Sequence, residues 1–405
     1  MSLYDALAPV VERHLYDTFP ACSISVVHQG NVFDQAWGVI DPDGERHPVT
    51  KDTLFDLASL TKLFITTAFL RFVSEGRIGL DDPLVKVVPE FGGAPRPIEG
   101  GHDPHSKERL PTPPELIGQG VDPARVTFRH LLTHTSGLPP WRDVYNAAGD
   151  APLSPDQRDL TARAVRWSQG LAALIDYPFV GQPDGKTVRY SDVGLMLLGE
   201  AVSRLDPDDG RDLAVTLDRL IFAAVEGLYF NPIRVHAISK ARIAPTEIDA
   251  TWRKRRAWGE VHDENACGVG GVAGHAGLFG TARAVAAFGE TWLRLVKGGD
   301  GFGIAPEVAH AATHLQVDDN GTRRGLGFAL KGAVDSMAGD RLSMNSFGHS
   351  GFTGTTLWID PDHDLVITLL TNRVYPGRWH TGAHGDIHDF RRAAHDAIAG
   401  WCGVG

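Results

Sequence analysis

The stretch FDLASLTKLF, residues 55–64, places Ser59 three residues before Lys62, at the point where an apolar helix is expected to begin. Residues i and i+3 share one face of a helix, with Cβ atoms about 5–6 Å apart, so the Lys62 amine can reach the Ser59 hydroxyl. A serine hydroxyl is a weak nucleophile and needs a neighbour that takes its proton. The stretch therefore indicates either a nucleophilic serine with a nearby base or a capping serine beside an ordinary surface lysine.

The predicted helix start adds two physical arguments for the first alternative. Free backbone N–H groups gather at the first turn, where they suit an oxyanion that develops beside Ser59. A lysine in the first turn faces the positive end of the helix dipole, which favours anions there. Burial and the dipole both favour the neutral form of Lys62, which can accept a proton.

A second motif, VRYSDVG at residues 188–194, contains Tyr190, Ser191 and Asp192. Tyr190 and Asp192 are two residues apart, so they lie on one side of an extended or turn segment. The tyrosine oxygen is a candidate proton relay, and the aspartate is a candidate partner for the lysine ammonium. The segment also fits a turn in which Ser191 or Asp192 caps the following helix, and both interpretations can hold together.

A third motif, FGHSGFTGTTLWID at residues 347–360, contains His349, Ser350 and Gly351. Its glycines and β-branched residues predict an edge strand that a ligand or another backbone segment approaches closely. A substrate could pair along that strand, and the backbone N–H of Phe352 could be a second oxyanion donor. The alternative is a plain bulged strand.

Four other stretches receive structural interpretations. We predict that LLTHTSGLPPW, residues 131–141, is a helix C-terminus ending at Gly137, rather than a Ser-His pair of His134 and Ser136. The basic run WRKRRAW, residues 252–258, is expected to be an exposed helix face. VHDENACGVGGVAGHAGLFG, residues 261–280, is too rich in glycine for regular structure, and WHTGAHGDIHDF, residues 379–390, is expected to be a solvated loop rather than a metal site.

Composition excludes several classes of protein. The chain has 405 residues, 42% of them apolar, and a formal net charge of -11 with acids and bases mixed along it. This balance argues against nucleic-acid binding, which needs a basic face. The N-terminal stretch predicts an amphipathic helix rather than a signal peptide, and no window is apolar enough for a membrane span. The three cysteines are far apart and predict free thiols, so we expect a cytoplasmic protein; its oligomeric state stays open.

The order of the predicted elements indicates how the chain is organised. A helix and two strands are followed by the helix of Ser59, a Pro/Gly-rich excursion at 89–126, a long helical block, further strands and a last helix. We expect residues 1–80 and 266–405 to form an α/β sheet domain and residues 81–265 to form a mainly helical lobe. A cleft between two such parts is the usual place for a site.

Together these motifs resemble the serine β-lactamase and penicillin-binding protein superfamily, most of all its branch of class C β-lactamases, D,D-peptidases and esterases. FDLASLTK looks like the nucleophile motif, and RHLLTHTSGL looks like a specific signature of the family. YSD stands where the branch has Tyr-x-Asn, and HSG stands where it has Lys-Thr-Gly or a variant. The resemblance implies an α+β fold of the β-lactamase/transpeptidase type: an antiparallel sheet with helices on both faces and an inserted helical lobe. It implies no cofactor and no metal.

The resemblance also implies roles for individual residues. Ser59 would form an acyl-enzyme with a small ester or amide: a β-lactam, a D-amino acid peptide or a carboxylic ester. Lys62 and Tyr190 would accept and return the proton, and which of them is the base stays open. Backbone N–H groups of Ser59 and Phe352 would form the oxyanion hole. Asp192, with the His349–Ser350–Gly351 motif, would complete the substrate-binding side.

Two departures from the family pattern carry chemical consequences. His349 replaces the usual lysine, and a histidine is mostly neutral at pH 7, so it binds a carboxylate less firmly. This favours an ester or a small amide, unless Arg373 supplies the positive charge. Asp192 replaces asparagine and should raise the pKa of Lys62, which makes Tyr190 the better base. A catalytically silent ligand-binding or sensor protein on the same fold is the alternative function.

Overall fold

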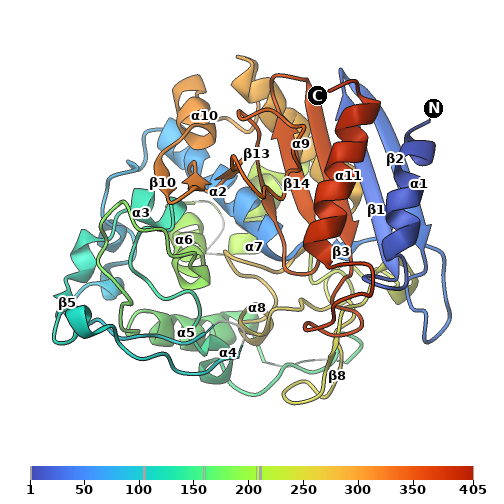
Figure 1. The fold of residues 1–405 in the computed structure, drawn as a ribbon. Helices are drawn as coiled ribbons and strands as arrows, with labels where there is room; N and C mark the ends of the chain where they lie inside the picture. Colours follow the sequence, from blue (N-terminus) through green and yellow to red (C-terminus); the bar gives the residue numbers. More distant parts are fainter. Residues whose placement is uncertain are drawn as a thin grey trace.

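An eight-stranded antiparallel sheet forms the centre of the computed structural model, which describes residues 2–103, 106–157, 159, 161–206, 208 and 212–404 (Figure 1). Its strand order is β10-β11-β12-β13-β14-β15-β1-β2. The strands are β1 Ala21–His28, β2 Asn31–Gly38, β10 Val317–Asp319, β11 Thr322–Arg324, β12 Ala329–Leu330, β13 Phe347–Ser350, β14 Thr356–Asp360 and β15 Leu365–Thr371. Because β1 pairs with β15, both ends of the chain contribute to one sheet, as predicted.

The hairpin of β1 and β2 has the turn that its sequence predicts. Gln29 and Gly30 connect the strands, and both have positive φ, 51° and 77°. Two central residues with positive φ give a turn whose twist matches that of the flanking strands. His28 therefore pairs with Asn31, and the register runs on to Ala21 opposite Gly38.

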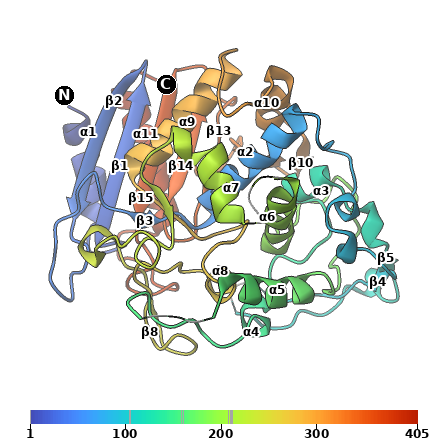
Figure 2. The same ribbon diagram turned by 180° about the vertical axis from the view of Figure 1, so that it is seen from behind.

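Helices cover both faces of the sheet, which confirms the predicted fold class. Helices α1 (Leu3–His14) and α11 (Ile387–Trp401) lie side by side on one face (Figure 1). Helix α9 (Ala282–Val296) packs against β1, β14 and β15 on the other face (Figure 2). Close packing requires a glycine here, because a Cβ at Gly289 would lie 2.6 Å from Cγ1 of Val366.

Helix α2 (Thr61–Ser74) lies in the interior and carries the candidate site at its start. A helix that is apolar all round is buried, and α2 contacts α6, α7 and α10. The remaining helices are α3 Phe128–Leu132, α4 Val144–Ala147, α5 Arg163–Leu174, α6 Asp192–Leu205, α7 Leu213–Leu220, α8 Glu264–Gly268 and α10 Pro306–Thr313. Figure 2 shows α6 and α7 next to α2, with α4 and α5 further from it along the lower edge.

The elements among the described residues of the Pro/Gly-rich excursion at 89–126 are short. They are the 3-10 turns η3 Pro89–Phe91, η4 Pro114–Leu116 and η5 Pro123–Arg125, and the paired strands β4 Arg96–Pro97 and β5 Gly120–Val121. Two further small sheets lie outside the excursion. One contains β3 Phe55–Asp56, β9 Leu278–Gly280 and β6 Leu228–Phe230, and the other contains β7 Ile248–Asp249 and β8 Arg255–Arg256.

Three local predictions were wrong. The basic run at 252–258 is no exposed helix face: its β8 pairs with β7, and Arg253 is 5% exposed. The helix predicted to reach Gly137 ends at Leu132, because His134 takes a left-handed φ of 58°. The glycine-rich stretch 261–280 does contain regular structure, namely α8 and β9.

Two findings bear on the environment of the chain. None of the described helices combines the length and the apolar character that crossing a bilayer requires. Cys22, Cys267 and Cys402 are free thiols, as predicted, and the first two are buried.

Candidate active site

A strained turn presents Ser59. The chain passes from β3 into the 3-10 turn η1 (Ala58–Leu60) and then into α2. Ala58 has a left-handed φ of 47°, and its N–H donates to Oδ1 of the buried Asp56 at 2.8 Å. This conformation costs about 1–2 kcal/mol for a residue other than glycine, and such strain clusters at functional sites. Ala58 and Leu60 are buried, whereas Ser59 is partly exposed.

Lys62 contacts Ser59 as the spacing predicts. Its side chain is 1% exposed, and Nζ donates to Ser59 Oγ at 2.8 Å and to the carbonyl oxygen of His275 at 3.0 Å. Asp192 Oδ1 lies 2.8 Å from the same nitrogen and forms an ion pair with it. Three oxygen atoms therefore surround Nζ, as many as an ammonium group has hydrogens.

These neighbours determine the charge of Lys62. Burial is the largest influence and lowers its pKa, but the Asp192 carboxylate and the Tyr190 phenol outweigh burial and leave the pKa above its ordinary value. Lys62 is thus an ammonium group at neutral pH. This result agrees with the expectation that Asp192 makes the lysine a poorer base.

The start of α6 brings Tyr190 and Asp192 to Lys62. Ser191 caps this helix by accepting the Gly194 N–H at 3.0 Å, and its hydroxyl donates to the Pro139 carbonyl at 2.7 Å. With the cap fixed, Asp192 reaches Lys62, and the centroid of the Tyr190 ring lies 5.0 Å from Lys62 Nζ. Ser191 is therefore the helix cap, one of the two interpretations of this motif.

His134 supports Tyr190 from both sides and is not a simple helix-end residue. Its carbonyl accepts the Arg189 N–H at 2.8 Å, and its Nδ1 accepts the Ser191 N–H at 3.1 Å. Its ring lies against that of Tyr190, with the centroids 4.5 Å apart. The left-handed turn at His134 makes these contacts, and the sequence offers no local signal for it.

Side chains from the turn after β13 attach it to the segment that carries Ser59. Thr353 donates to the Asp56 carbonyl at 2.7 Å, and Thr355 donates to the Leu57 carbonyl at 2.9 Å. A Cβ at Gly351 would lie 2.6 Å from the Leu57 oxygen. The HSG motif and Ser59 thus belong to two backbone segments in direct contact, and only glycine fits between them.

The prediction of an edge strand at β13 was wrong, because β12 and β14 flank it. However, β12 has only two residues, and its described register covers Phe347 and Gly348 alone. His349 and Ser350 extend beyond it. His349 and Ser350, at the end of β13, therefore have no β12 partner in the described register, so this part of the strand is open as an edge strand would be.

His349 is neutral in this structure. Its Nδ1 donates to the Ser350 carbonyl at 2.7 Å, and burial, together with Arg324 and Lys62, lowers its pKa to about 3. Its Nε2 is buried and makes no hydrogen bond to any part of the chain that the structure describes. The neutral tautomer with Nδ1 protonated leaves a lone pair on Nε2. His349 therefore cannot supply the positive charge of the lysine that it replaces.

Arg324 supplies a positive charge in this region and was missed in the sequence. It lies at the end of β11, with Cζ 5.5 Å from the centroid of the Tyr190 ring. Arg373, the residue suggested from the sequence, lies instead against Phe352: its Nε donates to the Phe352 carbonyl at 2.8 Å, and its Cζ is 4.3 Å from the ring centroid. The two short strands β10 and β11 have no pattern that predicts them.

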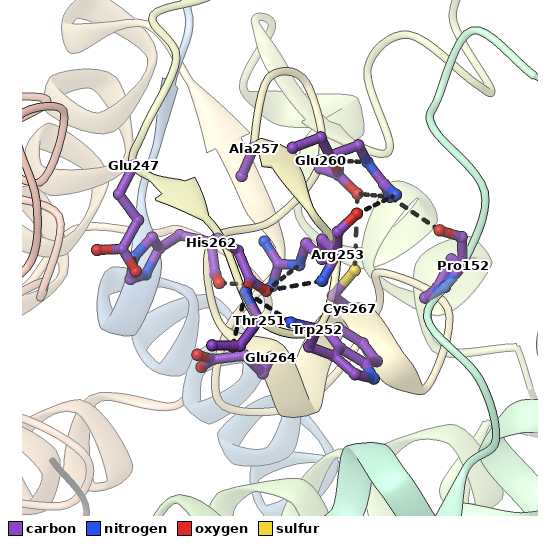
Figure 3. A network of polar contacts seen from close by, with 12 residues as sticks. Pro152, Glu247, Thr251, Trp252, Arg253, Ala257, Glu260, His262, Glu264 and Cys267 are labelled. Carbon is purple, nitrogen blue, oxygen red and sulfur yellow. Dashed lines mark hydrogen bonds and ion pairs between the residues drawn. The ribbon is translucent and has the colours of Figure 1, made fainter. Parts of the chain in front are cut away.

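His262, which stacks on Phe352, belongs to a polar network with Glu247 and Arg253, and Figure 3 shows this network. The His262 N–H donates to Asp56 Oδ2 at 2.6 Å, and its ring stacks on Phe352 with the centroids 5.7 Å apart. His262 Nε2 donates to Glu247 at 3.0 Å, and the buried Arg253 donates to the His262 carbonyl at 2.7 Å. His262 thus connects this network both to Asp56 and to Phe352.

Neighbouring residues of the same loop orient Lys62. His275, whose carbonyl accepts from Lys62, is itself buried, and its Nε2 donates to Asp263 Oδ1 at 2.8 Å. Burial raises the pKa of Asp263, but His275 outweighs burial and leaves the pKa below its ordinary value. Within the described ranges, no three His, Cys, Asp or Glu side chains converge as metal ligands would.

Comparison with known proteins agrees with this geometry. The model of the beta-lactamase family matches residues 11–389. A protein of Escherichia coli K12 named "Putative D-alanyl-D-alanine carboxypeptidase" is 29% identical over 383 residues, which cover 88% of this chain and 79% of the relative. Its Salmonella agona namesake is 27% identical over 394 residues, which cover 90% and 81% of the two chains.

Solved structures share the fold. EstCE1, described as a hydrolase with promiscuous acyltransferase activity, superposes with a TM-score of 0.68 at 21% identity, and the match covers 98% of each chain. A class C beta-lactamase from Rhodobacter sphaeroides superposes with a TM-score of 0.63 at 18% identity, over 98% of this chain and 99% of the other. The chain belongs to the beta-lactamase family, and it is a hydrolase of the beta-lactamase fold.

Replacing Gly351 with alanine tests the contact between the two segments. The added Cβ would lie 2.2 Å from Thr355 Oγ1 and 2.6 Å from the Leu57 oxygen, so the turn after β13 must shift relative to the segment that carries Ser59. We expect a loss of about 1–3 kcal/mol in the free energy of unfolding, as for other overpacked sites, and at least tenfold slower labelling of Ser59 by a fluorophosphonate. Gly332→Ala is the control, because its Cβ would have no neighbour closer than 3.5 Å. Equal labelling rates for the two variants would contradict the contact.

Proposed function

We propose that the protein is a serine hydrolase that forms an acyl-enzyme on Ser59 with a small ester or amide. The observation that carries the proposal is the convergence of Ser59, Lys62 and Tyr190 beside Gly351. Lys62 Nζ lies 2.8 Å from Ser59 Oγ and 5.0 Å from the Tyr190 ring centroid. Ser59 is thus hydrogen-bonded to an ammonium group that lies over a tyrosine ring, which places a candidate base close to the nucleophile, as covalent catalysis requires.

The charge of Lys62 favours Tyr190 as the base. Lys62 is an ammonium group surrounded by oxygen atoms, so it has no free electron pair to accept a proton. Lys62 and Arg324 both lie over the Tyr190 ring, so two cations stand beside the residue that we propose as the base. In this scheme Lys62 remains charged and Tyr190 moves the proton.

Acylation then proceeds in two steps. The Tyr190 phenolate takes the Ser59 proton while Oγ bonds to the substrate carbonyl carbon and the carbonyl electrons move onto its oxygen. The N–H groups of Ser59 and Phe352 stabilise this oxyanion. When the intermediate collapses, the bond to the leaving group breaks and Tyr190 returns the proton to that group. Water repeats the sequence and releases the acid, which restores Ser59.

The substrate class follows from the charges around Tyr190. His349 is neutral, but Arg324 is a cation close to both His349 and Tyr190, so we propose that the substrate carries a carboxylate there. Arginine binds a carboxylate through two parallel hydrogen bonds. The curated relatives named as D-alanyl-D-alanine carboxypeptidases support a D-amino acid peptide, and EstCE1 supports an ester.

Ser59→Ala tests the nucleophile. We expect the parent protein, but not the variant, to gain the mass of a fluorophosphonate or penicillin adduct, because the variant lacks the attacking oxygen. Turnover of short nitrophenyl esters, nitrocefin and a D-alanyl dipeptide should fall at least 10³-fold. Ser136→Ala is the control, since Ser136 is buried and its oxygen accepts the Leu138 N–H. Non-covalent binding with no turnover in the parent would instead support the silent ligand-binding protein.

Asp192→Asn distinguishes the two candidate bases. Without the carboxylate, burial dominates and the pKa of Lys62 falls. If the ammonium is required, activity is lost as pH rises through that pKa, so the alkaline limb of kcat/KM moves to lower pH. If Lys62 were the base, the acid limb would move down and activity at neutral pH would rise. We expect the first result, with the exposed Asp122→Asn unchanged from the parent.

Arg324→Gln tests recognition of the carboxylate. We expect kcat/KM for a D-alanyl dipeptide to fall about 10- to 100-fold, the effect of removing one charged hydrogen-bond partner. Turnover of a neutral ester should change less than threefold. Arg323→Gln is the matched control, because the neighbouring guanidinium donates to the Lys331 carbonyl. Equal losses on charged and neutral substrates would show that Arg324 does not select for charge.

A further inference from the structure

The peptide unit that joins Gly351 to Phe352 is held at its carbonyl end by a buried arginine. Arg391 lies in the first half of α11 and is 4% exposed. Its Nη2 donates to the Gly351 carbonyl at 2.7 Å and to the Thr355 carbonyl at 3.1 Å. The N–H of the same peptide unit is that of Phe352, which the proposed function assigns to the oxyanion hole.

A second arginine holds the next peptide unit. Arg373 Nε donates to the Phe352 carbonyl at 2.8 Å, and the Arg373 N–H donates to the Thr353 carbonyl at 2.9 Å. Phe352 therefore lies between two peptide carbonyls that each accept a hydrogen bond from an arginine. Its backbone has little freedom to rotate.

The hydrogen bond from Arg391 to the Gly351 carbonyl affects the Phe352 N–H in two ways, through its direction and through its polarity. A peptide unit is planar, with its C=O and N–H pointing in opposite directions, so a fixed carbonyl fixes the direction of the N–H. A charged donor at the carbonyl oxygen also polarises the peptide and strengthens its N–H as a donor. Arg391 thus acts on the oxyanion position without touching it.

No carboxylate forms an ion pair with Arg391 in the part of the chain that the structure describes, although the Asp386 carboxylate lies near enough to raise its pKa. Its hydrogen-bond partners there are the carbonyls of Gly351 and Thr355 and the sulfur of Met337 at 3.7 Å. Burial lowers its pKa to about 9, which still leaves the group charged at neutral pH. A buried charge is costly unless hydrogen bonds satisfy it. Here the hydrogen bonds place a positive charge at the carbonyl end of the Gly351–Phe352 peptide.

We propose that Arg391 is a positioning residue for catalysis: it orients and polarises the Gly351–Phe352 peptide, so that the Phe352 N–H binds the oxyanion of the transition state. The inference rests on the proposed function and assigns a reaction role to the C-terminal helix. Arg391 does not bind the substrate. It increases the rate most when negative charge develops on the carbonyl oxygen of the substrate.

The experiment compares Arg391→Met and Arg391→Lys. Loss of one oxyanion-hole donor lowers kcat about 10²–10³-fold, so we expect a fall of about 10- to 100-fold in kcat for Arg391→Met, with KM changed less than threefold. The acyl-enzyme carbonyl stretch, measured by infrared difference spectroscopy, should move to higher wavenumber because the carbonyl is less polarised. Arg391→Lys keeps the charge and should recover part of both effects.

Controls keep the result specific. Arg166→Met removes another buried arginine, one that donates to the Asp150 carbonyl in the helical region, and should leave kcat and the carbonyl band unchanged. If Arg391→Met does not fold by circular dichroism, Arg391→Lys and the less buried Arg373→Met replace it, with smaller shifts in the same direction. A folded variant with unchanged kcat and band overturns the inference alone. A parent protein that forms no acyl-enzyme overturns the proposed function and the inference together.

Discussion

A buried ammonium group is the constraint on which the site depends. Lys62 is 1% exposed and charged, and removing one partner from a buried ion pair typically costs about 3–5 kcal/mol. Its oxygen partners come from three distant segments: η1 with Ser59, the start of α6 with Asp192, and the loop that contains His275. Satisfying one charge therefore brings these three segments together.

The other contacts of the site are made mainly to the backbone. Thr353 and Thr355 donate to carbonyls of the segment that carries Ser59, and His134 accepts N–H groups on both sides of Tyr190. Such bonds fix the positions of peptide units, whatever side chains those units carry. The proposed oxyanion donors are themselves main-chain groups, so these backbone contacts fix their positions.

Local patterns predicted the central residues, because their geometry is local. The spacing of Ser59 and Lys62 defines a helix face, and the glycines after His349 indicate a close approach. His134 and Arg324 could not be predicted in the same way. The role of His134 arises from a left-handed turn and a contact 57 residues along the chain. Arg324 ends a three-residue strand, which is too short to produce a periodic pattern.

Cationic side chains lie at the centre of the site, although the whole chain has a negative net charge. The chain has a formal net charge of -11, yet Lys62 and Arg324 both face the Tyr190 ring. Arg391 donates to the Gly351 carbonyl. These cations are buried or half-buried, where salt and water screen them less than surface charges. His349 can then be neutral without leaving the site short of positive charge. In the proposed function, the recognition of negative charge lies on β11 at Arg324, and the end of β13 contributes shape and hydrogen bonding.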